Sequence, residues 1–277
     1  GCSGGNTNII LGNEAGKCIQ TGLCNVFIGA CAGKAVTSAS ENIAIGKNSG
    51  LAITSGNCNV LLGSIAGCKI TTSFDNVMIG CGAGMGNETG CENIFIGKCT
   101  AAAAAGSIRN LIIGDMAGQS GTFAGKYNVA LGASNMRDLT DGANNTFIGN
   151  ANAICATTGS RNIVMGTHNA WGNGAGTGAD NIVLGHCSFF CWNSAKTNVV
   201  IGKCAGHDMS SGCENVLIGC SAGYRLTDGN RNVIIGGYEQ TGSPGTGGDY
   251  NVFAGWNAGR CATTGNYNVV FGGNAGQ

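Results

Sequence analysis

The chain has 277 residues, 14 basic and 14 acidic side chains, and an unusual composition of 52 Gly, one Pro and 16 Cys. Its zero net charge excludes the strongly basic surface that nucleic acids and anionic lipids attract. The glycines follow no Gly-X-Y period, which excludes collagen, and 43% hydrophobic residues are too many for a disordered chain. Apolar runs are far shorter than the roughly 20 residues of a membrane helix. We therefore predict neither nucleic-acid binding nor a membrane span.

One motif recurs along the whole chain: an Asn, three mostly apolar residues and a Gly. Its 16 copies begin at 8, 25, 42, 59, 76, 93, 110, 128, 145, 162, 181, 198, 215, 232, 251 and 268, usually 17 residues apart. A period this strict indicates stacked repeats. Each repeat holds a β-branched segment and Gly-marked corners but no room for a useful helix. We predict an all-β fold, a parallel β-solenoid of sixteen coils, forming one continuous body over 1–277.

Positions within a coil are counted from the Asn, which is position 0. The Gly at +4 is expected where the backbone needs positive φ or approaches a neighbouring coil closely. The Asn is expected at the opposite corner, where its amide bonds the backbone or the Asn of the next coil. This predicted ladder includes Asn25, Asn42, Asn59, Asn76, Asn93 and Asn215. An Ala-Gly pair at +7 and +8 follows in most coils but is lost in those beginning at 93, 128, 145, 162, 181 and 232.

Position +2 is apolar in all sixteen coils. Neighbouring residues of a strand point to opposite faces, so if +1 and +3 fill the interior, +2 faces outward. An exposed apolar stripe of this length is expected to be covered, and no sequence is left over to cover it. This predicts a lateral homo-oligomer, such as a homotrimer. Its interface would contain Phe27, Leu61, Met78, Phe95, Ile112, Phe147, Leu217, Ile234 and Phe253.

Two Gly-rich insertions, near 172–178 and 242–248, are expected to bulge as loops from one corner. Trp171, Phe189, Phe190 and Trp192 cluster around the first, where they either stack on sugars or replace missing core. Gly1 lies at position +10 and Gln277 at +9, so a second copy would continue the phase. We expect either head-to-tail stacking or a segment of a longer repeat protein. The initial Gly is expected of a mature or excised piece.

Sixteen cysteines favour an oxidising location, outside a cell or on a particle surface. Three pairs that are 13 residues apart are predicted as disulfides between neighbouring coils: Cys18–Cys31, Cys68–Cys81 and Cys191–Cys204, with Cys187–Cys204 as the alternative for the third. Cys2 and Cys261 are candidates for a link between stacked protomers. The spacing of Cys204 and His207 resembles metal ligation with His186, Cys187 and Cys191. No CxxC pair supports it, and we predict no metal or cofactor.

The sequence contains no catalytic set in coil register. Its only regular acids precede the leading Asn and are expected to form a solvated rim: Glu41, Asp75, Glu92, Asp180 and Glu214. We therefore predict no enzymatic activity. Thr residues at +12 and +13 suggest an ice-binding face as a minor alternative, although other residues interrupt that column.

The repeated Asn-[Val/Ile]-x-[Ile/Leu]-Gly, Ala-Gly and Thr-Thr-Gly elements resemble the Asn/Gly repeats of phage and giant-virus tail fibres. They also resemble the head repeats of trimeric autotransporter adhesins, which form parallel β-rolls. The resemblance implies a trimeric, non-enzymatic fibre on a cell or virion surface. The 17-residue period and the many cysteines depart from these families. Two functions are therefore expected: a filament subunit stacked head to tail and held by disulfides, or an adhesin shaft that binds host glycans.

Overall fold

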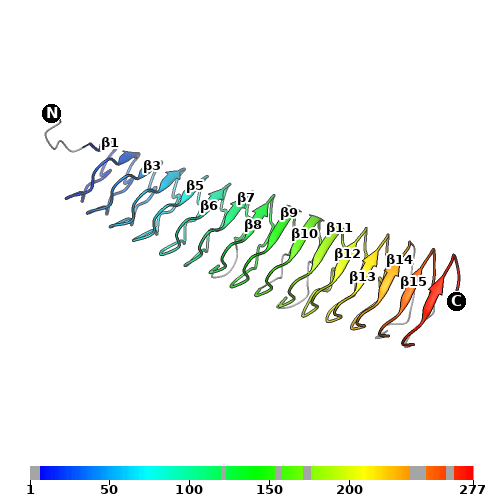
Figure 1. Ribbon diagram of the computed structural model, residues 1–277. Helices are drawn as coiled ribbons and strands as arrows, with labels where there is room; N and C mark the ends of the chain where they lie inside the picture. The colour runs from blue at the N-terminus through cyan, green and yellow to red at the C-terminus, as the bar shows by residue number, and fades with distance from the viewer. Residues whose placement is uncertain are drawn as a thin grey trace. The chain divides into compact units, whose positions relative to one another are not determined.

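A computed structural model describes residues 7–119, 123–153, 157–170, 176–237, 248–259 and 265–276. These residues form sixteen short β-strands and no α-helix, so none of them lies in a helix able to cross a lipid bilayer. The chain groups into two compact units, Gly1–Asp141 and Gly142–Gln277. Each unit contains eight strands, which Figure 1 shows as successive arrows. The prediction of a single continuous body over 1–277 stays a prediction.

The strands of the first unit are β1 (Ile9–Leu11), β2 (Val26–Ile28), β3 (Ile43–Ile45), β4 (Val60–Leu62), β5 (Val77–Ile79), β6 (Ile94–Ile96), β7 (Leu111–Ile113) and β8 (Val129–Leu131). Those of the second unit are β9 (Thr146–Asn150), β10 (Ile163–Thr167), β11 (Ile182–His186), β12 (Val199–Ile201), β13 (Val216–Ile218), β14 (Val233–Ile235), β15 (Val252–Ala254) and β16 (Val269–Phe271).

Within each unit every strand pairs in parallel with the next strand along the chain, and equivalent positions lie opposite each other. Val26 pairs with Ile43 and Val60 with Val77 in the first unit, as Val199 pairs with Val216 in the second. One strand per coil at a spacing of about 17 residues confirms the predicted parallel β-solenoid.

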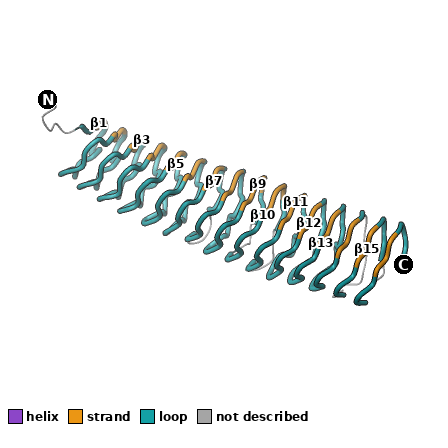
Figure 2. Tube along the Cα trace, in the orientation of Figure 1, coloured by secondary structure: helices purple, strands orange, loops and turns teal. Residues whose placement is uncertain are grey.

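Hydrogen bonds between coils continue beyond the strands. Figure 2 shows that most of each coil is turn and loop rather than strand. These segments still pair with the next coil, as in Gly16 N–H to the Ala32 carbonyl (2.9 Å) and Thr37 N–H to the Thr54 carbonyl (3.0 Å). The whole outline of a coil is therefore repeated by its neighbour, which holds the register along the complete repeat.

The interior of each coil is formed by positions 0, +2, +7, +11 and +14. Phe27, Ala32, Val36 and Ala39 line one coil and are fully buried. Large and small residues alternate across the narrow interior between +2 and +11, because the two side chains share one space. The opposed pairs include Phe27 with Val36, Ala44 with Ile53, Phe95 with Ala104, Ala130 with Leu139, and Val183 with Trp192.

The prediction that position +2 faces outward is wrong. All nine residues assigned to a lateral interface lie inside their own coils, at 0–7% exposure: Phe27, Leu61, Met78, Phe95, Ile112, Phe147, Leu217, Ile234 and Phe253. The strand phase is set by the leading Asn, which points inward and is itself buried. Position +2 lies on the same side of the strand, so +1 and +3 point outward.

The segments 172–175 and 242–247 of the two predicted insertions lie outside the described residues, as do Trp171, Cys2, Cys155 and Cys261. Described backbone on either side of the first insertion follows the coil path, since Gly178 and Asp180 hydrogen bond to neighbouring coils.

Candidate functional site: ladders inside the coils and the outer face

The leading asparagines form a continuous ladder inside each unit. The Asn42 backbone N–H and its Nδ2 both donate to Asn25 Oδ1, at 3.0 and 3.1 Å. Nδ2 also donates across the coil to the Gly56 carbonyl at 2.9 Å. A buried amide normally carries a large desolvation cost, which this pattern offsets by satisfying its oxygen and its nitrogen. The predicted ladder is confirmed for Asn25, Asn42, Asn59, Asn76, Asn93 and Asn215.

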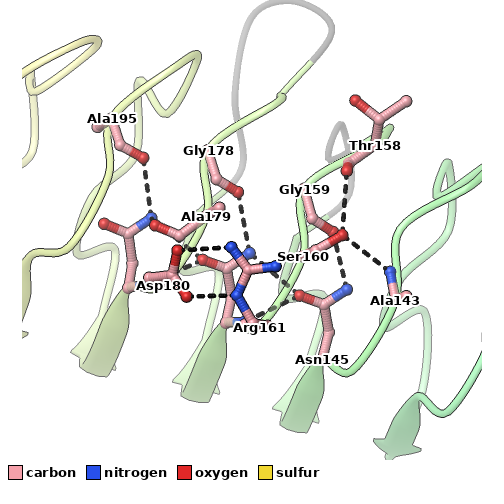
Figure 3. Close-up of polar contacts among 12 residues, drawn as sticks. Ala143, Asn145, Thr158, Gly159, Ser160, Arg161, Gly178, Ala179, Asp180 and Ala195 are labelled. Atoms are coloured by element: carbon pink, nitrogen blue, oxygen red, sulfur yellow. Dashed lines mark hydrogen bonds and ion pairs between the residues drawn. The ribbon is translucent and has the colours of Figure 1, made fainter.

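The same arrangement holds in the second unit. Figure 3 shows the Asn145 amide donating to the Gly159 carbonyl, 2.8 Å away, on the far side of its coil. Asn162 in turn donates its N–H and Nδ2 to Asn145 Oδ1, both at 3.0 Å. The two ladders therefore use the same three hydrogen bonds per rung, with the 19-residue steps accommodated elsewhere in the coil.

The Gly at +4 fits both reasons predicted for it. Gly29 has φ +127°, a region that is essentially restricted to glycine. A Cβ there would lie 2.7 Å from both the carbonyl carbon and the oxygen of Gly46 in the next coil. The close approach and the backbone conformation coincide, so no other residue fits at this position.

A second polar ladder, which was not predicted, occupies position +7 where the Ala-Gly pair is missing. Asn169 accepts the Ser188 N–H at 2.9 Å and receives none of its own support from apolar neighbours: its N–H donates to Asn152 Oδ1 at 3.1 Å, and its Nδ2 to the Gly185 carbonyl at 2.7 Å. These side chains are fully buried. The signal was present in the sequence as Asn at the same position of consecutive coils.

The outer face of the solenoid is formed by positions +1 and +3. All sixteen residues at +3 are apolar, and so are all but Thr146 at +1. They are partly accessible: Ile43 is 37% and Ile45 38% exposed, whereas Ala44 between them is fully buried. The strands therefore carry apolar residues on both faces, and the face left in contact with solvent is the opposite one to that predicted.

The residues just before the ladder form an exposed column with paired charges. Position −1 has positive φ in every described coil from Cys24 to Tyr267. Arg109 bonds Glu92 at 2.7 Å, and Arg161 bonds Asp180 at 2.6 Å, as drawn in Figure 3. The pKa of Asp180 is lowered by its hydrogen bond to Arg161. The predicted acidic rim is therefore an exposed column in which arginines from neighbouring coils neutralise several of the acids.

The cysteine pairs predicted as disulfides are free thiols in the structure. In-register stacking explains this result. The Cys18 N–H bonds the carbonyl of Lys34 (3.1 Å), whereas the Cys31 N–H bonds that of Asn13 (2.8 Å), so each thiol stacks on its own position in the next coil. The six residues Cys18, Cys31, Cys68, Cys81, Cys191 and Cys204 are all unpaired with sulfur, as is the alternative partner Cys187. Cys2 and Cys261 lie outside the described residues.

Burial raises the pKa of the Cys68, Cys191 and Cys204 thiols, which disfavours the reactive thiolate. His207 lies between the rings of Phe190 and Tyr224, with centroids 5.0 and 4.6 Å away, and its Nδ1 is 2.6 Å from Asp208. The residues considered for a metal site are thus divided between ring stacking and exposed thiols. Among the described residues no group of three or more His, Cys, Asp or Glu is placed to hold a metal ion.

The aromatic residues near the first insertion have mainly a core role. Phe189 is fully buried and Trp192 nearly so, and their rings stack with centroids 5.8 Å apart. The Trp192 Nε1 is buried without a hydrogen-bond partner in the part of the chain that is described. Phe190 is half-buried in the outer ring stack. Of the two roles considered for this cluster, replacement of core is the one that Phe189 and Trp192 have.

The Thr hydroxyls at position +12 are used within the solenoid. Thr37, Thr54 and Thr71 each donate to a backbone carbonyl of the next coil, at 3.1–3.2 Å. A regular face of hydroxyls directed to solvent is therefore not formed at these three coils.

Comparison of the chain with protein-family models, curated proteins and solved structures finds no match, so the resemblance to fibre repeats rests on the residue pattern alone.

Proposed function

We propose that the chain is a non-enzymatic structural fibre protein, located outside a cell or on a cell or virion surface, whose coils stack end to end. The observation that carries the proposal is the last strand. Within the second unit, Val252 N–H donates to the Asn268 carbonyl at 2.8 Å, so the amide at +1 points to the following coil. The equivalent amide of β16, at Val269, points to an edge that no described strand covers.

An open edge of this kind is a template for another strand. The residues of β16 keep the repeat pattern, so the edge can be extended by more of the same polypeptide or by a second copy. Stacking by a second copy reuses hydrogen bonds that every internal coil already makes. A protomer link through Cys2 and Cys261 belongs to the same proposal.

The experiment is electron microscopy and fibre diffraction of the purified 277-residue chain. We expect filaments much longer than sixteen coils, with a meridional reflection near about 4.8 Å from the stacked strands. Discrete particles at all concentrations would overturn end-to-end stacking. Shortening of the filaments by reductant would support the cysteine link, and unchanged length would exclude it.

Val269→Pro is the matched test of the edge. Proline removes the amide that would donate to the next coil, whereas the bond from Val252 to the Asn268 carbonyl is unaffected. We expect this variant to fold and to form no long filaments, and Val269→Ala to form them normally. Filaments of equal length from both variants would show that β16 is not the growing end.

A glycan-binding shaft is the second candidate, and one group of residues favours it. The rings of Tyr250 and Tyr267 stack with centroids 4.9 Å apart and are 40% and 75% exposed, and Arg231 lies over Tyr250. Exposed aromatic faces beside a hydrogen-bond donor suit the apolar face and hydroxyls of a sugar. Glycan-array binding that is lost in Tyr267→Ala and kept in Tyr127→Ala would support this function. No bound glycan would exclude it.

A further inference from the structure

The outer face of the first unit has the properties of a contact surface. Its two columns, positions +1 and +3 of β1–β8, contain sixteen aliphatic residues and no charge. Ile43, Ile45 and Ile94 are 37–40% exposed, and most of the others are half-buried. Contiguous apolar patches above a few hundred Å² mark interaction sites in soluble proteins. With roughly a third of each side chain accessible, this face presents on the order of 800 Å², about one partner's share of a standard interface.

The shape of this face restricts its partner. Aliphatic side chains stand in two straight rows, and the spacing along each row is that of stacked parallel strands, about 4.8 Å. Two sheets pack with their side chains interdigitated only where both rows repeat at the same distance. A second copy of this chain presents the same spacing over the full length of the face. It therefore buries the whole face.

Charges at the borders of the face indicate the relative direction of the two copies. Position −1 precedes the outer residues of each strand and position +5 follows them. Three coils of the first unit are charged at both positions, and in each the two signs are opposite: Glu41 with Lys47, Glu92 with Lys98, and Arg109 with Asp115. In the third coil the order of the signs is reversed and the complementarity is kept.

Two copies that face each other with parallel solenoid axes are related by rotation about that axis. This operation reverses the strand direction, so position −1 of one copy meets +5 of the other at the same coil level. All three charged coils then place unlike charges together. With antiparallel axes, position −1 meets −1, where the first unit carries Glu41, Asp75 and Glu92 against one arginine. Like charges across an interface disfavour that arrangement.

We propose that the outer face of the first unit binds the same face of a second copy, with solenoid axes parallel and equivalent coils level. At the coils of β6 and β7, the bonded pair Glu92–Arg109 of one copy then lies opposite Lys98 and Asp115 of the other. The four charges alternate in sign. This lateral contact deepens the proposed fibre function, on which it rests, by naming the partner that thickens the fibre.

Mass per unit length, measured by scanning transmission electron microscopy, separates the two proposals. We expect at least two chains at each coil level. Filaments with one chain per level would overturn the lateral contact and leave end-to-end stacking intact. Short particles of two chains would overturn end-to-end stacking and leave the lateral contact intact.

The double variant Ile43→Lys/Ile45→Lys tests the face itself in the Val269→Pro background, which isolates lateral association. Both side chains point outward, so we expect an unchanged circular dichroism spectrum and a dissociation constant raised at least 100-fold in sedimentation velocity. Ser38→Lys, an exposed position in the loop after β2, is the matched control and should leave the constant unchanged. A monomeric parent at 100 μM, or equal association of parent and double variant, would overturn the proposal.

Cross-linking tests the parallel direction. At the coil of β4, position −1 is Cys58 and position +5 is Ser64, and both are exposed. In the proposed arrangement, Ser64→Cys places its thiol opposite Cys58 of the second copy, and a short bis-maleimide should link residues 58 and 64 between chains. Ser38→Cys should give no link to Cys58. Links between two copies of Cys58, without the 58–64 link, would overturn the parallel arrangement.

Discussion

Two corners of the same repeat solve one packing problem in different ways. In the coils of β4 and β5, position +7 is Ala66 or Ala83, a small apolar residue fully buried before a Gly of positive φ. In the coils of β9 and β10 it is Asn152 or Asn169, equally buried. The strands there are five residues long, whereas β4 and β5 have three. A polar residue is accepted inside the solenoid where the next coil supplies its hydrogen-bond partners.

The comparison also explains why the Ala-Gly pair is lost as a unit. Ala153 and Ala170 follow the two asparagines with φ of 53° and 52°, values that cost an ordinary residue about 1–2 kcal/mol. The amide ladder offsets this strain in the second unit. In the first unit Gly67 and Gly84 avoid it.

The position that both corners share should tolerate change least. Gly29→Ala places a Cβ 2.7 Å from the backbone of Gly46 and puts a side chain at φ +127°. We expect a loss of about 4 kcal/mol or more in the free energy of unfolding, enough to unfold part of the first unit. Urea unfolding followed by circular dichroism measures it. Gly106→Ala, where the nearest atom is 3.6 Å away, is the control and should cost less than 1 kcal/mol; equal costs would show that close approach is not the cause.

The main ladder should be the next most sensitive element. Asn59→Ala removes the acceptor of the Asn76 N–H and Nδ2 and the donor to Asn42 Oδ1, all of them buried. Leaving these groups unsatisfied should cost about 3–5 kcal/mol. Asn57→Ala is the control, because this exposed side chain accepts a single backbone bond, from Ser40 at 2.8 Å. If Asn59→Ala is no worse than Asn57→Ala in urea unfolding, the ladder does not stabilise the fold.

Exchanging the two corners tests the comparison directly. Ala66→Asn puts an amide into a corner without ladder partners, and Asn169→Ala leaves the Ser188 N–H and the Gly185 carbonyl without their partners. Each change should cost about 1–3 kcal/mol. All three tryptophans of the chain lie in the second unit, so fluorescence reports Asn169→Ala and circular dichroism reports Ala66→Asn. A neutral Ala66→Asn would show that an isolated amide is accommodated and that the ladder is not required.

The period and chemistry of the repeat were sufficient to predict the solenoid, its parallel register, the ladder and the reason for Gly at +4. The direction of the strand was not predictable from apolarity, because +1, +2 and +3 are all apolar. The decisive fact is that Asn25 and its equivalents are buried, which only the satisfied hydrogen bonds make possible. The same error of phase hid position +11, where Val36, Ile53 and Ile70 form a core column. The disulfide prediction failed because it assumed contact between different positions of neighbouring coils.

Ion pairs outside the coils should contribute least, and their effect should depend on pH. Hydrogen bonds from Lys17 and Lys34, each at 2.6 Å, lower the pKa of Glu14 from 4.5 to about 2. A carboxyl whose pKa is lower in the folded state stabilises the fold above its unfolded value, and this contribution disappears as the pH falls through the folded value. Glu14→Gln should therefore have a small cost near pH 7, well below that of Asn169→Ala, because these side chains are exposed and solvent screens them. The difference between parent and variant should shrink from about pH 4.5 downward and vanish near pH 2 in urea unfolding. Glu88→Gln, which removes a carboxyl outside this cluster, is the control. A difference that persists unchanged at pH 2 would show that Glu14 acts through packing rather than through its charge.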